Sequence, residues 1–403
     1  MIGIKLKKHK KETMNKICEY LNPKYVYFKI DENELLVKKD AKVLKGEKIL
    51  KTKYDTFIHS SVSGKVIDIV EKIDYKNNKS SFIKIENDFK EKEIYKPINK
   101  KLNKKEFIEN LKNNGIVGLG GAGFPTYIKY NSDNIKTLII NAVECEPYIT
   151  ADYNLLFNNI KEIIDSINII DGIYNLNEIY IAIKVNNRLL KEKIIPYTNQ
   201  KIKLVEVPNL YPMGWEKSLV RYIKHTDYKK LPIEKNIVIS NVSTIYSIYE
   251  SITKNKPLIE KIITVSGEVE NKTNIKIKIG TEFSELKKIY KKYLVKDATI
   301  VAGGPMMGNA IETDNFIIPN NLNSVIVLNK EEINETPCIR CGKCSDNCPV
   351  KISPVLVKDN IKNIEELKRL DVNRCIECGI CSYLCPAKIN LREFMRDAKK
   401  KVK

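Results

Sequence analysis

The hydrophobic residues of this chain follow different patterns in its first, middle and last parts. In the first part, apolar residues alternate with polar ones in short runs, at Val43, Ile49, Val66, Ile67 and Ile69. Short alternating runs are typical of strands that bury one face. The pattern therefore predicts a small β sandwich near the N-terminus.

The middle part changes from a helical pattern to a loop and then to a strand. The stretch that ends at Asn113–Gly115 predicts a helix, and the apolar run Leu138–Ile140 predicts a buried strand. Between them lies GLGGAGFPT, from Gly118 to Thr126, with four glycines in its first six residues. Because glycine lets a backbone approach a partner closely, this loop is the first candidate for a ligand site.

The last part combines a helical pattern with regularly spaced cysteines. Apolar residues stand at helical spacing between two cysteine motifs, at Ile361, Ile364, Leu367 and Leu370. This spacing predicts a helix between the motifs. We therefore expect the cysteine-rich part to be helical rather than a small β-rich ferredoxin.

Composition narrows the class of protein. The chain has 403 residues, 43% of them hydrophobic, which predicts two to four domains with cores of their own. No apolar run approaches the roughly 18–20 residues of a membrane span. The opening MIGIKLKKHKKETM lacks the apolar core of a signal peptide, so we expect a cytosolic protein.

The net charge of +20 comes from 70 Lys and Arg residues against 50 Asp and Glu residues. No motif with arginine forks or aromatic platforms accompanies it, so we expect no nucleic-acid binding. Two interpretations stay open: drift in composition, or a lysine-rich face that meets anionic lipid or an acidic partner. Any membrane contact should then be peripheral.

Eight of the ten cysteines form two copies of the motif C-x2-C-x2-C-x3-C-P. This is the spacing of two-cluster ferredoxins, in which the fourth cysteine of each motif ligates the cluster of the other. The predicted ligands of one [4Fe–4S] cluster are Cys338, Cys341, Cys344 and Cys385. Those of the other are Cys375, Cys378, Cys381 and Cys348. Zinc is the alternative, although zinc usually takes two C-x2-C pairs without a third cysteine or a Cys-Pro.

The glycine-rich loop is neither a Walker A motif nor the usual dinucleotide fingerprint, and a tight structural turn is the alternative. The strand after it ends in polar residues: Asn141, Glu144 and Glu146. Ligands bind at the carboxyl ends of such strands, and carboxylates suit ribose hydroxyls or a nicotinamide amide better than phosphate. Cys145 has acidic neighbours that would raise its thiol pKa, so we expect no nucleophile there.

These motifs resemble a known module. GLGGAGFPTYIK followed by NAVECEPY is similar to the flavin- and NADH-binding module shared by the NADH-oxidising subunit of respiratory complex I and by the RnfC subunit of Rnf ion-translocating electron transport complexes. YPMGWEKSL and SNVSTIYSI agree in order. VSGEVENKTNIKIKIGT and AGGPMMG resemble the soluble-ligand-binding β-grasp segment that follows in both families.

The two ends of the chain favour the Rnf family. Two cluster motifs are present rather than one, and the segment LVKKDAKVLKGEKILKTKYDTFIHSSVSGKVIDI resembles the biotinyl-like barrel-sandwich domain at the start of RnfC. Trp215 departs from the pattern, because complex I has an acidic residue there. A tryptophan at this position could stack on a ring or simply pack.

The resemblance implies FMN, NAD(H) and two clusters as cofactors. The residues it implies for FMN are Gly118, Gly120, Gly121, Gly123, Lys129, Asn141, Glu144, Tyr211, Gly214 and Asn241. For NADH it implies Phe124, Glu146 and Glu216. Catalysis in this family is a matter of positioning, and we assign no general acid or base.

The expected fold is multidomain, α/β and α+β. The predicted parts are an N-terminal β barrel-sandwich (1–100), an α/β FMN- and NADH-binding domain (101–255), a β-grasp domain (256–330) and a helical two-[4Fe–4S] domain (331–403).

The expected function is that of an NADH-oxidising, or NAD-reducing, subunit. It would sit at the cytoplasmic face of a bacterial membrane in an Rnf-type complex, with other subunits and ferredoxin as partners. The alternatives are a soluble reductase of the cobalamin-reductase type and an electron relay with an inactive nucleotide site.

Overall fold

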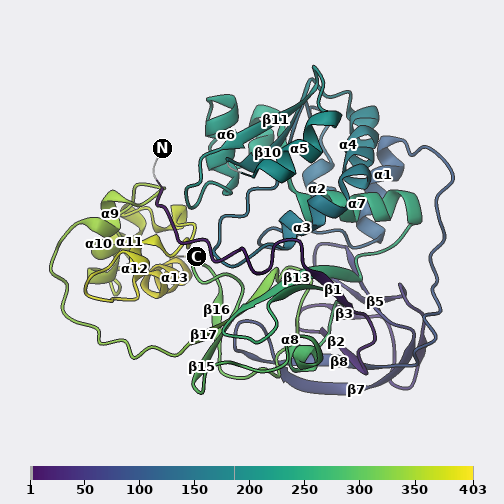
Figure 1. Cartoon of the computed structure of the whole chain (residues 1–403), viewed down its shortest axis with the longest axis horizontal. Coiled ribbons are helices and arrows are strands. Elements are labelled where there is room, and N and C mark those ends of the chain that lie inside the picture. Colours follow the sequence, from purple (N-terminus) through teal and green to yellow (C-terminus); the bar gives the residue numbers. More distant parts are fainter. Residues whose placement is uncertain (1–2, 186, 403) are drawn as a thin grey trace.

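The computed structural model describes residues 3–185 and 187–402. Figure 1 shows an α/β part at the top, a β-rich part at the lower right and a group of short helices at the left. The N-terminal segment runs between the first two parts before it enters strand β1. No helix in the described ranges is long and apolar enough to cross a membrane.

The N-terminal part contains two small sheets. The four-stranded sheet has the order β2 (Tyr25–Lys29), β8 (Lys79–Asn87), β7 (Gly64–Ile73), β4 (Lys42–Val43). The three-stranded sheet has the order β3 (Glu34–Leu35), β5 (Lys48–Lys51), β6 (Phe57–His59). Val43, Ile49 and Val66 are buried, as their alternation predicts, whereas Ile69 is 53% exposed. The register of β7 shifts between Val66 and Asp68, and such a shift turns the following side chains to the other face.

The middle part is a parallel four-stranded sheet that carries helices on both faces. Its order is β11 (Ile202–Val207), β10 (Glu178–Lys184), β9 (Thr137–Asn141), β12 (Ile237–Asn241). Its helices are α1 (Lys104–Asn113), α2 (Thr126–Tyr130), α3 (Ala151–Asn158), α4 (Ile160–Tyr174), α5 (Arg188–Ile194), α6 (Glu216–Lys224) and α7 (Val242–Lys254). The predicted helix before Asn113–Gly115 is α1, which begins with a capping box between Asn103 and Glu106.

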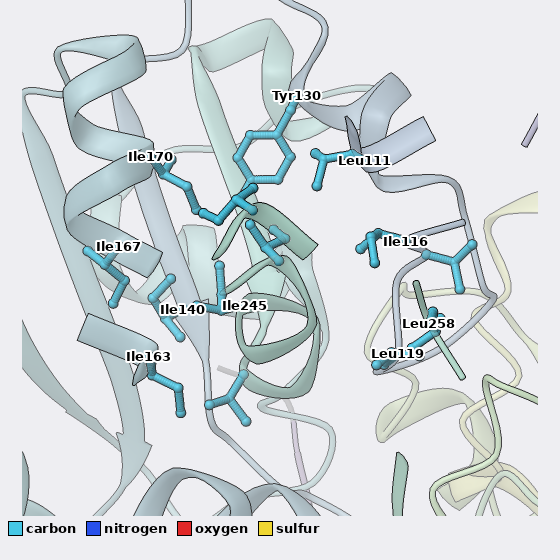
Figure 2. Packing of buried hydrophobic residues seen from close by; sticks show 14 of the residues in the cluster. Leu111, Ile116, Leu119, Tyr130, Ile140, Ile163, Ile167, Ile170, Ile245 and Leu258 are labelled. Carbon is cyan, nitrogen blue, oxygen red and sulfur yellow. The ribbon is translucent and has the colours of Figure 1, made fainter. Parts of the chain in front are cut away.

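The core of this part explains the apolar run in β9. Ile140 faces the side covered by α4 and α7, where it packs with Ile163, Ile167 and Ile245 (Figure 2). Ile139 faces the opposite side and packs near Val220 of α6. A strand that is buried on both faces has no polar alternation, so its sequence is continuously apolar.

A six-stranded mixed sheet follows the α/β part. Its order is β1 (Ile17–Tyr20), β14 (Thr273–Lys278), β13 (Glu260–Gly267), β17 (Ser324–Asn329), β15 (Ala298–Ala302), β16 (Asn309–Ile311). Helix α8 (Lys287–Tyr290) lies beside it. The edge strand β1 comes from the N-terminal end and pairs in parallel with β14, which joins the beginning of the chain to this sheet.

The last part is built of short helices, as the sequence predicts. They are α9 (Lys343–Asp346), α10 (Pro354–Asp359), α11 (Ile364–Arg369), α12 (Ile380–Tyr383) and α13 (Leu391–Lys401). The predicted helix between the cysteine motifs is shorter than its apolar spacing suggests. Only Leu367 of α11 is fully buried, whereas Ile364 is 46% exposed. Ile361 and Leu370 lie outside the helix and still pack on the core of this part.

Candidate functional site

The glycine-rich loop is a narrow excursion between α1 and α2. Its base is closed by two backbone hydrogen bonds, from Gly118 N–H to Phe124 O (2.8 Å) and from Thr126 N–H to Ile116 O (2.9 Å). At its tip, Leu119 N–H donates to Thr244 Oγ1 of α7 (3.0 Å). These contacts hold the loop next to the N-terminal end of α7.

Two glycines at the tip of the loop differ in what surrounds them. A Cβ on Gly120 would come within 2.9 Å of the Asn241 side chain, so glycine is needed there for close approach. A Cβ on Gly121 would meet nothing within 4 Å. The loop therefore packs against Asn241 at one position and faces open space at the next, which fits a flat or phosphorylated ligand laid against the backbone.

The carboxyl ends of β9 and β12 bring two predicted asparagines together. Asn141 and Asn241 are paired in the strand register. Asn141 Nδ2 donates to Gly214 O (2.8 Å), and Asn241 Oδ1 accepts from Ser243 N–H (2.8 Å) as the N-cap of α7. Because β9 has β10 on one side and β12 on the other, this is the point of the sheet where α/β folds bind ligands.

Asp152 is a residue of this site that sequence reasoning missed. Its buried carboxylate accepts from Asn241 Nδ2 and from Ser243 Oγ, both at 2.6 Å. Burial raises the pKa of Asp152, while these two hydrogen bonds act to lower it. Asp152 thus fixes the Asn241 amide. Its acidic side chain in the first turn of α3, the next element after β9, was the available signal.

Glu144 lies beneath the N-terminal segment. Its Oε1 accepts from Asp152 N–H (2.8 Å), and its Oε2 lies 3.8 Å from Lys10 Nζ. Lys10 Nζ also donates to the backbone oxygen of Glu144 (2.9 Å). Burial raises the pKa of Glu144 to about 7, and the charge of Lys10 opposes that shift. No local pattern in the sequence indicated that Lys10 would reach this carboxylate.

Glu146 is held by a loop of the six-stranded sheet. Its two carboxylate oxygens accept from Met306 N–H and Met307 N–H, both at 2.9 Å. Burial raises its pKa to about 7, while the two N–H groups and Arg392 oppose the shift. Any nucleotide hydroxyl at Glu146 would have to share these oxygens, which retain free lone pairs.

Lys129 and Glu216 form an ion pair with a 2.6 Å separation between Lys129 Nζ and Glu216 Oε1. Lys129 Nζ also donates to Ile239 O of β12 (2.6 Å). Phe124, at the end of the loop, is 44% exposed and lies edge-on to Tyr54 with ring centroids 6.3 Å apart. An exposed aromatic ring at the end of this loop is accessible to a planar ligand.

Tyr211 joins the α/β part to the cysteine-rich part. It is buried, its backbone pairs with Ile4, and its hydroxyl donates to Cys378 O (2.6 Å). Tyr211, Met306, Cys378 and Ile380 form one apolar cluster. The predicted flavin residue Tyr211 therefore touches a predicted cluster ligand directly.

We call Cys348, Cys375, Cys378 and Cys381 the inner group. All four line one cavity, which has about 360 Å³ of empty volume, part of it open to solvent. Cys348 comes from the first motif and the other three come from the second, so the structure brings together the set that the crossed pattern predicts. Burial raises the pKa of Cys378 and that of Cys381 to about 12, so a metal centre here would have to displace thiol protons.

We call Cys338, Cys341, Cys344 and Cys385 the outer group. Cys338, Cys344 and Cys385 pack against one small apolar cluster, which Cys381 of the inner group also touches. Cys341 is exposed. In the described residues, no three His, Cys, Asp or Glu side chains stand where they could hold a single metal ion. The inner thiols surround a space rather than a point, which suits a cluster.

Trp215 and Cys145 have structural surroundings. Trp215 packs on the core of the cysteine-rich part, which includes Cys348; packing is one of the two roles that the sequence left open. Cys145 accepts a hydrogen bond from Gly214 N–H (2.7 Å). Its thiol pKa is raised as predicted, although the main cause is burial rather than the acidic neighbours.

A further cavity lies between the N-terminal segment, the α/β part and β13. It has about 1750 Å³ of empty volume, part of it open to solvent. Its lining includes Ala142 and Glu144 at the end of β9, together with Lys8, Lys11 and Lys184. This cavity gives solvent access to the carboxyl edge of the sheet.

Three family models match the chain. They describe the RnfC barrel sandwich hybrid domain (residues 1–90), the Nuo51 FMN-binding domain (111–250) and a 4Fe-4S dicluster domain (337–389). The glycine-rich loop, Asn141, Tyr211 and Asn241 all fall inside the FMN-binding match. The eight cysteines of the inner and outer groups fall inside the dicluster match.

Curated relatives share a common description. The chain is 31% identical over 340 residues to component C of the proton-translocating ferredoxin:NAD(+) oxidoreductase complex of Clostridium ljungdahlii, covering 80% of this chain and 74% of that protein. It is 32% identical to component C of the ion-translocating oxidoreductase complex of Rhodobacter capsulatus (80% and 66%) and 33% identical to that of Buchnera aphidicola from Acyrthosiphon pisum (82% and 73%).

Among solved structures, the chain is similar in fold to a NAD+-reducing [NiFe]-hydrogenase. For its air-oxidised state the TM-score is 0.51 at 15% identity, covering 75% of this chain and 63% of that one. For its H2-reduced state the TM-score is 0.50, also at 15% identity, covering 74% and 61%. At this identity the similarity concerns the fold alone.

Proposed function

Because this chain belongs to the RnfC family of ion-translocating oxidoreductase complexes, we propose that it exchanges electrons with NAD(H) and relays them through FMN and two [4Fe–4S] clusters. When bound, FMN supplies the conversion between a two-electron hydride carrier and one-electron carriers. The clusters supply one-electron steps. The chain's own residues bind, orient and connect these groups.

We propose that the FMN lies at the carboxyl ends of β9 and β12. The open space at Gly121 supports this placement, since a Cβ there would meet only what binds against the loop. Gly118, Gly120 and Gly123 shape the loop, and the fixed amides of Asn141 and Asn241 offer polar contacts beside it. The remaining proposed FMN contacts are Lys129, Glu144, Tyr211 and Gly214.

Lys129 and Glu216 divide their roles in this proposal. Lys129 bonds Ile239 O of β12 and pairs with Glu216, and we propose that it also contacts the phosphate or the ring system of the flavin. Glu216, Phe124 and Glu146 would contact NADH. Phe124 is supported by its exposure beside the loop, whereas Glu146 would have to keep its bonds to Met306 and Met307.

The observation that carries the proposal is the hydrogen bond from Tyr211 to Cys378 O. Tyr211, a proposed flavin contact, thus bonds directly to the backbone of Cys378, a cysteine of the inner group. Electrons from the flavin would therefore enter the inner group first, and the outer group, whose Cys341 is exposed, would pass them onward.

We further propose that the onward carriers are other subunits of a membrane complex, with ferredoxin as the distant redox partner. The family and the names of the relatives support this assembly. The chain would attach peripherally, at the cytoplasmic face, through contacts with those subunits. Attachment to membranes that contain the partners, without attachment to partner-free anionic vesicles at physiological salt, would support this.

The test of the proposed function is NADH oxidation by the purified full chain. Protein reconstituted with FMN, iron and sulfide should reduce an artificial one-electron acceptor when NADH is added, and should carry about eight irons. A chain that holds FMN and both clusters but does not react with NADH would be a relay with an inactive nucleotide site, and the proposal would be wrong.

A further inference from the structure

Arg392 of α13 lies at the junction of three parts of the molecule. It lines the cavity of the inner group together with Cys348, Cys375, Cys378 and Cys381. Its terminal nitrogens bind a loop of the six-stranded sheet, and that loop in turn binds Glu146 of the α/β part. Arg392 is not among the predicted site residues.

The guanidinium of Arg392 is fixed at one end. Nη1 donates to Met306 O (3.0 Å), and Nη2 donates to Met307 O and to Gly308 O (2.9 Å). Three carbonyls therefore hold both terminal nitrogens. All three partners are neutral carbonyls, so no carboxylate bonds the guanidinium directly, although the carboxylates of Glu146 and Glu393 act on its charge from nearby.

The third nitrogen of Arg392 is different. Nε is buried, and no atom in residues 3–185 and 187–402 accepts a hydrogen bond from it. A buried N–H of a charged group without an acceptor is costly, so such donors are rare in folded proteins. Arg392 also lines the inner cavity, so the sulfur atoms of a cluster in that cavity are the candidate acceptors for this N–H.

The loop that holds Arg392 is itself held close to the inner group. Gly379 directly follows Cys378, and a Cβ on it would come within 2.4 Å of Met306 O. Met306 is buried in the same cluster as Tyr211 and Cys378. The carbonyls that fix Arg392 are thus fixed against the inner group, which limits how far the guanidinium can move away.

We propose that Arg392 donates its Nε–H to the sulfur shell of the inner cluster and thereby raises the reduction potential of that cluster. A fixed positive charge and a hydrogen bond to sulfur both favour the form with one more electron. The inner cluster would then accept electrons from the flavin side readily. This inference rests on the proposed function only in taking the inner group to hold a cluster.

The test is a redox titration of the holoprotein followed by electron paramagnetic resonance, in the wild type, Arg392→Lys and Arg392→Leu. Iron and sulfide contents are measured first, so a missing cluster is recognised separately from a shifted potential. The resonance signal that is lost in Cys381→Ser is assigned to the inner cluster. Arg369→Gln is the control, because it removes an exposed charge of the same part that pairs with Glu366.

We expect Arg392→Leu to lower the reduction potential of the inner cluster by at least about 59 mV, which is a tenfold change in the equilibrium constant of its reduction. The potential of the outer cluster should not change. Arg392→Lys, which keeps the charge without Nε–H, should lower the potential of the inner cluster less. An unchanged potential of the inner cluster in both variants at full iron content would overturn the proposal. So would loss of the inner cluster in both, because Arg392 would then be a structural support, and so would an equal shift in Arg369→Gln.

Discussion

The inner and outer cysteine groups have the same sequence motif and different surroundings. The inner group lines a cavity, touches Tyr211 of the α/β part and lies beside the positive charge of Arg392. Three cysteines of the outer group pack on a small cluster within their own part, whereas Cys341 and the neighbouring Ile339 are exposed, the latter by 67%. The two groups thus share a motif and differ in what they pack against, and the proposed order of the clusters in the electron path rests on that difference.

The largest effect is expected from Cys348→Ser. Cys348 belongs to the first motif but lies in the inner cavity, so the variant should lose the inner cluster and keep the outer one. Iron should fall from about eight to about four atoms per chain. Cys18→Ser is the control, because Cys18 lies in β1, away from both groups, and should keep all the iron. Loss of the outer cluster instead would refute the crossed pairing.

Gly121→Val should remove the flavin while both groups stay intact. The backbone of Gly121 is not left-handed, and a side chain there meets no protein atom, so the variant should fold. Valine would instead fill the space proposed for FMN. Flavin and iron contents of the purified protein measure this. Gly172→Val is the matched control, since Gly172 on α4 also has open space around it. Full flavin content in Gly121→Val would make the loop a structural turn only.

Glu146→Gln should change how the unfolding free energy of the protein depends on pH. The pKa of Glu146 rises from an ordinary 4.5 to about 7 in the folded chain, chiefly through burial. The folded protein therefore binds more protons than the unfolded chain between these values, and this contribution to stability is lost as the pH rises from 4.5 through 7.

The difference in unfolding free energy between wild type and Glu146→Gln should thus favour the wild type more at pH 5 than at pH 7.5. The expected change is on the order of 2 kcal/mol. Denaturant unfolding at both pH values measures it. A difference that does not vary with pH would show that Glu146 is not the titrating group.

The smallest effect is expected from Tyr211→Phe. Loss of one buried hydrogen bond should cost about 1 kcal/mol and slow reduction of the inner cluster at unchanged flavin content. Tyr174→Phe is the control, because the Tyr174 hydroxyl also donates to a backbone oxygen, that of Tyr130 (2.7 Å), inside the α/β part. Its stability should fall similarly without slower cluster reduction. Equal rates of inner-cluster reduction in both variants would show that the Tyr211 hydroxyl plays no part in electron transfer.

Cysteine spacing and the glycine run are short motifs, so the grouping of Cys348 with three cysteines of the second motif and the position of the loop could be predicted from a few residues each. That these residues bind a cluster and FMN stays a prediction. Strand β9 and its polar end followed from one apolar run, whereas the pairing of β9 with β12 was not predicted. The β-sandwich pattern misplaced Ile69, because the register shift in β7 leaves no mark in the alternation.

The residues that the sequence did not indicate are those whose partners lie far away along the chain. Lys10 meets Glu144, and Arg392 meets the carbonyls of Met306, Met307 and Gly308. Asp152 reaches Asn241 across the end of the sheet. Nothing in a single sequence relates such pairs, since the contacts exist only after the three parts have packed together.

The order of the two clusters in the electron path is the central claim, and rapid-freeze paramagnetic resonance after mixing with NADH tests it most directly. Two variants are compared, Cys381→Ser, which lacks the inner cluster, and Cys341→Ser, which lacks the outer one. The account predicts that NADH reduces the remaining inner cluster of Cys341→Ser at the wild-type rate and leaves the outer cluster of Cys381→Ser oxidised on that timescale. Rapid reduction of the outer cluster without the inner one would contradict it.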